Sequence, residues 1–81
     1  MTNATMRAKF KVVDVDKRDG CEILKFSAVY KDGAYPADGT DEDNTFAKWT
    51  PQAECAMTVN NPALFGQFII GDKFYVDFTP A

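Results

Sequence analysis

The chain has 81 residues, a formal net charge of −3 and a sequence pI near 4.7, so it is too short for two ordinary domains and has room for one small hydrophobic core. Its acidity removes the general attraction to nucleic acid that a strongly basic chain has, and any such binding must depend on a local face. The sequence contains no His and a single Ser, Ser27, which excludes the Ser-His-Asp and Cys-His routes of catalysis, and we expect a protein that is not an enzyme and uses no cofactor.

The first regular pattern covers residues 6–12, where apolar and polar residues alternate strictly. This alternation predicts a half-buried strand. The side chains on the face opposite the core are those of Arg7, Lys9 and Lys11. At Val12-Val13 the alternation slips by one residue, which predicts either a β-bulge or a strand that passes from one packed layer to another.

A turn signal at Lys17–Gly20 joins this strand to a second one over residues 21–30, and the two are expected to form a hairpin. The second strand is apolar almost throughout, which is typical of a central strand covered on both faces. Residues 32–44 then carry five acids and no base, whereas residues 1–31 carry seven bases and four acids. We expect residues 31–44 to form a mobile acidic loop.

Two further strands are predicted after the loop, over residues 45–50 and 53–59, with Pro51 between them. Asn61 followed by Pro62 is typical of a capped helix start, and it predicts one short helical turn over residues 62–65. The last strand follows Gly71-Asp72. Its inward-facing residues are Phe74, Val76 and Phe78.

The order of these elements predicts an all-β, mostly β, fold: a small five-stranded antiparallel barrel or sandwich, SH3-like or OB-like, with one short helical turn before the last strand. An OB fold would place its helix one strand earlier, but strand order alone does not separate these possibilities. Nor does the number of strands decide whether the sheet closes on itself.

No metal site is predicted. Cys21 and Cys55 have neither a CxxC partner nor a His nearby, and we expect them to be reduced, small hydrophobic side chains. The acidic loop contains one cluster of carboxylates, namely Asp38, Asp41, Glu42 and Asp43. Its spacing fails the EF-hand pattern, so a solvated acidic loop is favoured and calcium binding is kept as a hypothesis.

One basic and aromatic set raises the possibility of binding single-stranded nucleic acid or a nucleotide, with lysines following phosphates and aromatic rings stacking on bases. Its members are Arg7, Lys9, Lys11, Lys48, Trp49 and Tyr75, with Lys25 expected nearby. The competing interpretation is that alternating lysines keep the wet face of a strand soluble and block edge pairing.

A second candidate is a dense apolar segment before the last strand. It consists of Phe65, Phe68, Ile69 and Ile70. The segment either plugs the end of the fold or leaves an exposed patch, and an exposed patch would mark an interface with a protein partner or with another copy of the chain.

Several motifs resemble those of short uncharacterised proteins of tailed phages and prophages. They are Met6-Arg7-Ala8-Lys9-Phe10, the stretch Asn44 to Pro51, Asn61-Pro62 and the stretch Gly71 to Pro80. The resemblance implies that residues 1–5 are a flexible leader before a single domain over residues 6–81. No activity is attached to those proteins, so no functional residue carries over.

The resemblance also implies a class of function. We expect a small non-catalytic phage or prophage binding module, either a virion component or a blocker of a host protein. Its expected location is the host cytoplasm or the virion. The apolar runs are too short to span a membrane, so no membrane partner is expected.

Overall fold

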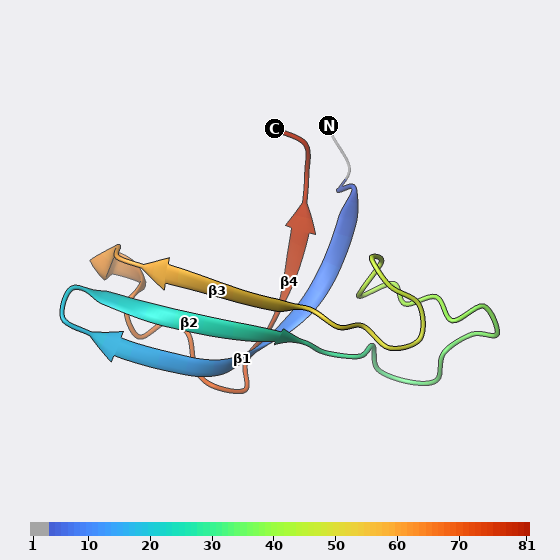
Figure 1. The fold of residues 1–81 in the computed structure, drawn as a ribbon, viewed down its shortest axis with the longest axis horizontal. Coiled ribbons are helices and arrows are strands. Elements are labelled where there is room, and N and C mark those ends of the chain that lie inside the picture. Colours follow the sequence, from blue (N-terminus) through green and yellow to red (C-terminus); the bar gives the residue numbers. More distant parts are fainter. Residues whose placement is uncertain (1–3) are drawn as a thin grey trace.

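The computed structural model describes residues 4–81 and confirms the all-β character of the chain (Figure 1). Its elements are β1 (Met6–Arg18), β2 (Cys21–Ala28), β3 (Glu54–Val59), the 3-10 helix η1 (Pro62–Leu64) and β4 (Lys73–Phe78). The four strands form one antiparallel sheet in the order β3-β2-β1-β4. The helical turn before the last strand is where the sequence predicts it, with the Asn61 side chain accepting a hydrogen bond from the Ala63 N–H at 3.1 Å.

β1 belongs to two parts of the sheet. Its first half pairs with β4, from Met6 opposite Phe78 to Lys11 opposite Lys73, while its second half pairs with β2. The register shifts between Val12 and Asp14, so the predicted slip is a β-bulge. Beyond the bulge the strand bends, because the extra residue increases the local twist. Figure 1 shows the outcome: β4 and the first half of β1 form an arm that points away from β2 and β3.

The core lies on one face of the sheet. Its buried members are Ala8, Phe10, Val12, Leu24, Phe26 and Val59. Partly buried residues from outside the strands, including Phe46, Phe65 and Phe68, pack against it. The molecule measures 48 × 29 × 15 Å and has a radius of gyration of 14.5 Å. A compact domain of this length has a radius of gyration of about 12 Å, so the molecule is elongated. Met57, Phe74 and Phe78 on the same face are 53%, 36% and 47% exposed, so the chain itself covers this apolar face only in part.

The strand predicted over residues 45–50 does not form. Trp49 has a φ of 65°, the left-handed region in which a strand cannot continue. Its N–H donates to Gly39 O at 2.9 Å, and the Thr50 N–H donates to Lys48 O at 2.8 Å. The backbone therefore curls at Lys48–Thr50 instead of extending.

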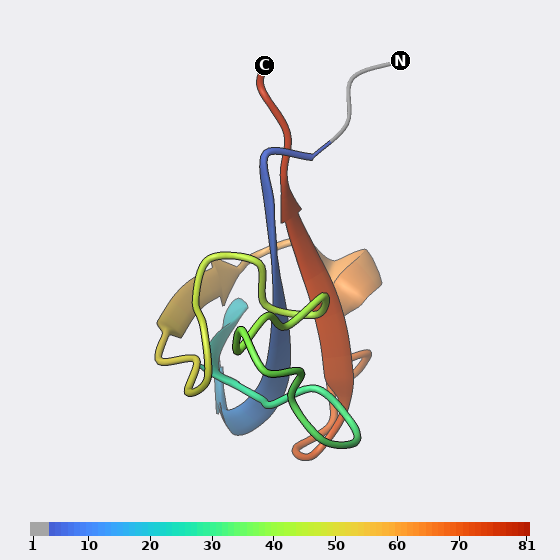
Figure 2. The same cartoon turned by 90° about the vertical axis from the view of Figure 1, so that its right-hand side faces the viewer.

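Because that strand is missing, residues 4–81 contain four strands where five were predicted, and the sheet is open. β3 and β4 are its two edges. Figure 2 looks at the molecule from the side that carries the loop between β2 and β3, with β4 along one edge. A closed barrel is thus not present in the described part of the chain.

The first and last described residues of the ladder lie beside each other on the arm. Residues 1–3 of the expected leader lie outside the described residues. The Thr5 N–H donates to Phe78 O at 2.7 Å, so the ladder between β1 and β4 extends to this residue. No helix within residues 4–81 has the length and apolar character needed to cross a membrane.

Candidate functional site

The outer face of β1, opposite the core, is covered by the loop of residues 29–45. Asn44 anchors this loop and is fully buried, with 0% of its surface exposed. Its Oδ1 accepts from the Lys9 N–H at 2.8 Å, and its Nδ2 donates to Val29 O at 2.6 Å. The Val29 N–H in turn donates to Lys9 O at 2.9 Å. The Asn44 side chain thus bridges two backbones where the ladder between β1 and β2 ends.

Asp41 holds the same loop from within. Its carboxylate accepts from the Tyr35 hydroxyl at 3.2 Å, from the Asp43 N–H at 2.9 Å and from the Asn44 N–H at 3.2 Å. The Asn44 Nδ2 also donates to it at 3.2 Å. Burial pushes the pKa of Asp41 up, but these hydrogen bonds outweigh it and hold the pKa below its ordinary value. The carboxylate is therefore ionised at neutral pH, and its hydrogen-bonding capacity is used by donors of the loop itself.

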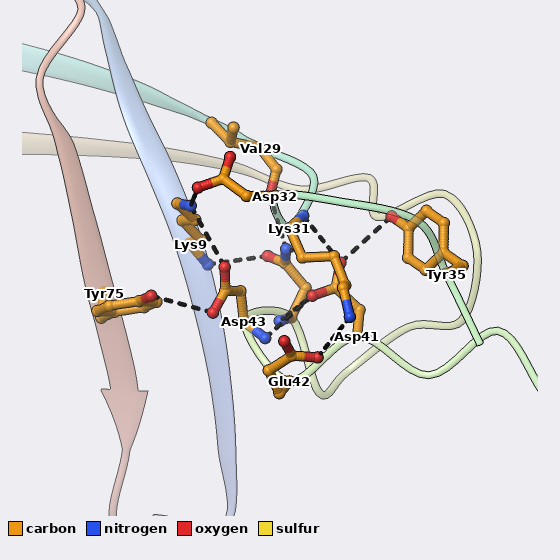
Figure 3. Close-up of polar contacts among 10 residues, drawn as sticks. Lys9, Val29, Lys31, Asp32, Tyr35, Asp41, Glu42, Asp43 and Tyr75 are labelled. Atoms are coloured by element: carbon orange, nitrogen blue, oxygen red, sulfur yellow. Dashed lines mark hydrogen bonds and ion pairs between the residues drawn. The ribbon is translucent and has the colours of Figure 1, made fainter.

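The Lys9 side chain extends from β1 toward two carboxylates, and Figure 3 shows its ammonium between Asp32 and Asp43. The Lys9 Nζ lies 3.3 Å from Asp43 Oδ2 and 3.8 Å from Asp32 Oδ2. From the other side, the Tyr75 hydroxyl of β4 donates to Asp43 Oδ1 at 3.0 Å. This bond to a carboxylate raises the pKa of Tyr75.

Arg7, two residues earlier on the same face, is paired as well. Its Nε and one terminal nitrogen donate to the two carboxylate oxygens of Asp77 at 2.7 and 2.9 Å. This bidentate pair lowers the pKa of Asp77. The guanidinium also lies 4.7 Å from the centre of the Tyr75 ring, within the range of a cation–π contact. Both positive charges at this end of β1 are therefore balanced by neighbouring acids.

The structure brings together only part of the set predicted to bind nucleic acid. Arg7, Lys9 and Tyr75 form one contact network, and Lys11 lies further along the same strand, opposite Lys73. Lys25 is in β2, opposite Asp14.

The other two members of the set, Lys48 and Trp49, lie outside the sheet. The Trp49 ring is 6.0 Å from that of Tyr35. A Cβ at Gly39 would collide with the Trp49 indole, so this ring is packed closely on the loop backbone.

The acidic cluster does not converge on a point. Asp41 accepts from the loop's own donors, Asp43 pairs with Lys9, and Glu42 lies 2.9 Å from the Lys31 ammonium. Asp38 accepts from the Thr40 hydroxyl at 2.9 Å. In the described part of the chain, no three acidic or thiol side chains are placed to hold a metal ion. The thiols of Cys21 and Cys55 are free and half-buried.

The apolar segment before β4 divides into two pairs. Phe65 and Phe68 are half-buried against the core, and the Phe68 ring lies 6.4 Å from that of Phe26 and 5.3 Å from that of Phe74. Ile69 and Ile70 are instead 59% and 60% exposed. The first pair covers the sheet, and the second pair faces solvent.

Exposed apolar side chains continue from this turn onto the arm. Met6 and Phe78 lie opposite each other on the same face of the sheet as Phe10 and Phe74, and Phe78 is 47% exposed. We refer to the exposed residues of the turn and the arm as the apolar surface; they are Met6, Ile69, Ile70, Phe74 and Phe78. The sequence predicts the inward direction of Phe74 and Phe78, but it does not predict that the face they occupy is left uncovered.

The anchoring role of Asn44 has no signal in the sequence. Asn44 stands at the end of an acidic run, where an asparagine is typical of a solvated turn.

No protein-family model matches the chain, and comparisons with curated proteins and with solved structures return no significant match.

Proposed function

We propose that this chain is a non-catalytic binding module that acts on a protein partner or on a second copy of itself through the apolar surface. The observation that carries the proposal is the exposure of Ile69 and Ile70, at 59% and 60%, beside an edge strand. Exposed apolar side chains that gather in one region are typical of sites of protein interaction. An adjacent free edge adds backbone groups that a partner's backbone satisfies.

The proposal also accounts for the open sheet. A single sheet needs a second layer over its apolar face, and here η1 and the segment around Phe65 and Phe68 cover only part of that face. A bound protein supplies the rest of this layer. The barrel or sandwich expected from the sequence is, in this proposal, completed by the partner.

The resemblance to short proteins of tailed phages and prophages supports a particular setting. We propose that the module serves as a virion component or as a blocker of a host protein, in the virion or in the host cytoplasm. Both roles require binding and neither requires catalysis.

Binding of single-stranded nucleic acid has less support. Arg7 and Lys9 are already paired with Asp77 and Asp43, and these carboxylates repel a phosphate backbone. Trp49, the best stacking residue of the set, makes its aromatic contact with Tyr35 in the loop. Lys48 and Trp49 lie outside the sheet, apart from the face that Arg7, Lys9 and Tyr75 share.

A capture experiment from infected cells tests the proposal. The immobilised chain is compared with an Ile69→Asp/Ile70→Asp variant and with an Ala56→Asp/Thr58→Asp control, which adds the same charge on the outer face of β3. We expect a defined protein to be retained by the parent chain and the control and lost from the Ile variant, with mass spectrometry as the readout. Equal retention on all three chains, or retention of nucleic acid alone, would contradict it.

A further inference from the structure

The backbone of β4 is free on one side, and the hydrogen bonds identify which groups are unpaired. The Val12 N–H donates to Asp72 O at 2.9 Å. In an antiparallel pair, hydrogen-bonded and non-bonded positions alternate. The residues of β4 that bond to β1 are therefore Phe74 and Val76, opposite Phe10 and Ala8.

The alternate residues of β4 turn the other way. Their N–H and C=O groups point to the free edge of the sheet, and they are Lys73, Tyr75 and Asp77. The side chains of the same three residues share the outer face, because they are two residues apart. The free edge thus carries one positive end, one tyrosine and one negative end.

The positive end lacks a counter-charge. Lys73 lies directly opposite Lys11 in the ladder, and like charges in that position destabilise a sheet. Among residues 4–81, Lys73 makes no ion pair within 4.0 Å. Asp77 at the other end pairs with Arg7 and is still 37% exposed, so its outer side is open.

We propose that β4 pairs antiparallel with β4 of a second copy of this chain, about a two-fold axis that passes through Tyr75. In this register each Tyr75 faces the partner's Tyr75, and Lys73 faces the partner's Asp77. All the backbone groups that point to the free edge then form hydrogen bonds across the axis. The inference rests on the proposed function and names a second copy as the protein partner.

Charge complementarity selects this register. Within its own chain Lys73 lies opposite another positive charge, Lys11, whereas the partner's Asp77 supplies a negative one. The two-fold symmetry provides this contact twice. A two-fold axis at Val76 would instead place Lys73 opposite Thr79. It would also centre the contact on a residue whose backbone groups are used by β1.

The apolar face gains from the same pairing. Phe74 comes opposite the partner's Val76, so the two apolar faces join across the axis and form one continuous surface. Pairing also satisfies the backbone groups at the β4 edge, which are otherwise free to bond to any extended chain.

Sedimentation analysis of the purified chain tests the proposal. We expect a dimer at micromolar concentration. Lys73→Glu and Asp77→Lys each place like charges across the axis, and each is expected to raise the dissociation constant of its own dimer at least about tenfold at low salt. An equimolar mixture of the two variants is expected to form a heterodimer, because every contact across the axis again joins opposite charges.

The control is Glu54→Lys in β3, which changes the net charge as Asp77→Lys does but lies on the other edge of the sheet. It is expected to leave the dimer intact. A monomeric parent chain at several hundred micromolar, or a dimer that none of the charge changes affects, would overturn the inference.

Amide hydrogen exchange on the unmodified chain provides a second test that needs no variant. The N–H groups of Tyr75 and Asp77 are expected to exchange fast at low concentration and slowly at high concentration, while that of Val76 is protected at both. No concentration dependence at Tyr75 contradicts the pairing. A monomer that still captures a protein through Ile69 and Ile70 overturns this inference alone, and a dimer sensitive to Lys73 supports it even when no other protein is captured.

Discussion

The 29–45 loop and the apolar surface differ in what they leave unsatisfied. In the loop, the side chains of Asn44 and Asp41 are buried and hydrogen-bonded. Within residues 4–81 no buried side-chain nitrogen or oxygen lacks a hydrogen-bond partner. In the apolar surface, Ile69, Ile70 and Phe78 are exposed to solvent. Buried polar groups need partners of defined geometry, which the chain supplies to itself. The apolar groups need only a dry neighbour, and a second protein can provide it.

The largest effect that tests this comparison is expected from Asn44→Ala. The exchange leaves the Lys9 N–H and the Val29 C=O buried without a partner, at about 1.5 kcal/mol each, so the free energy of unfolding should fall by about 3 kcal/mol. Urea unfolding followed by tryptophan fluorescence measures it. Asn60→Ala, at an exposed position, is the control and should change the free energy by less than about 0.5 kcal/mol. Equal effects at the two positions would show that the loop is not anchored through Asn44.

Sequence patterns predict the parts of this fold that depend on neighbours along the chain. The alternation over residues 6–12 predicts the first strand, the slip at Val12-Val13 predicts the bulge, and Asn61-Pro62 predicts η1. These features arise from steric and capping preferences of a few adjacent residues.

The missing strand shows where such patterns fail. Residues 45–50 have the composition of a strand, but the conformation of Trp49 is set by its contacts with Gly39 and Tyr35, which lie ten or more residues away. Tertiary contacts override strand propensity in this way. The contacts of the candidate site are likewise not predictable from the sequence, since the pairing of Arg7 with Asp77 depends on the register between the first and last strands.

A smaller effect is expected from acidification, and it concerns Asp41. Its pKa in the folded chain lies below the ordinary value of 3.8, so the unfolded chain takes up the proton first as the pH falls. The carboxylate therefore stabilises the fold above about pH 4, and this stability is lost as the pH drops through the folded pKa.

Asp41→Asn tests this directly. The variant should lose about 1 kcal/mol at pH 7, because an amide nitrogen now faces donors, and its stability should depend less on pH below 4 than that of the parent chain. Asp19→Asn, in the exposed turn after β1, removes the same charge as a control. Parallel pH curves for the parent chain and the Asp41 variant would mean that the buried carboxylate does not set the acid response.

The smallest effect on stability is expected where the apolar surface is most exposed. Ile69→Gln/Ile70→Gln removes two large apolar side chains, yet both are more than half exposed, and the free energy of unfolding should change by less than about 0.5 kcal/mol. Phe68→Ala, next to them in the chain but half-buried against Phe26 and Phe74, should cost about 2 kcal/mol by the same measurement.

The Ile variant should nevertheless bind less of a hydrophobic dye than the parent chain does, because the dye needs exposed apolar surface and Ile69 and Ile70 are its most exposed members. A loss of stability as large as that of Phe68→Ala would place Ile69 and Ile70 in the core of the free chain. The exposed part of the turn before β4 would then belong to the fold itself, and the contrast between the 29–45 loop and the apolar surface would weaken. A stable variant with reduced dye binding instead shows that these side chains are exposed in the free chain and do not support the fold, as an interaction surface requires.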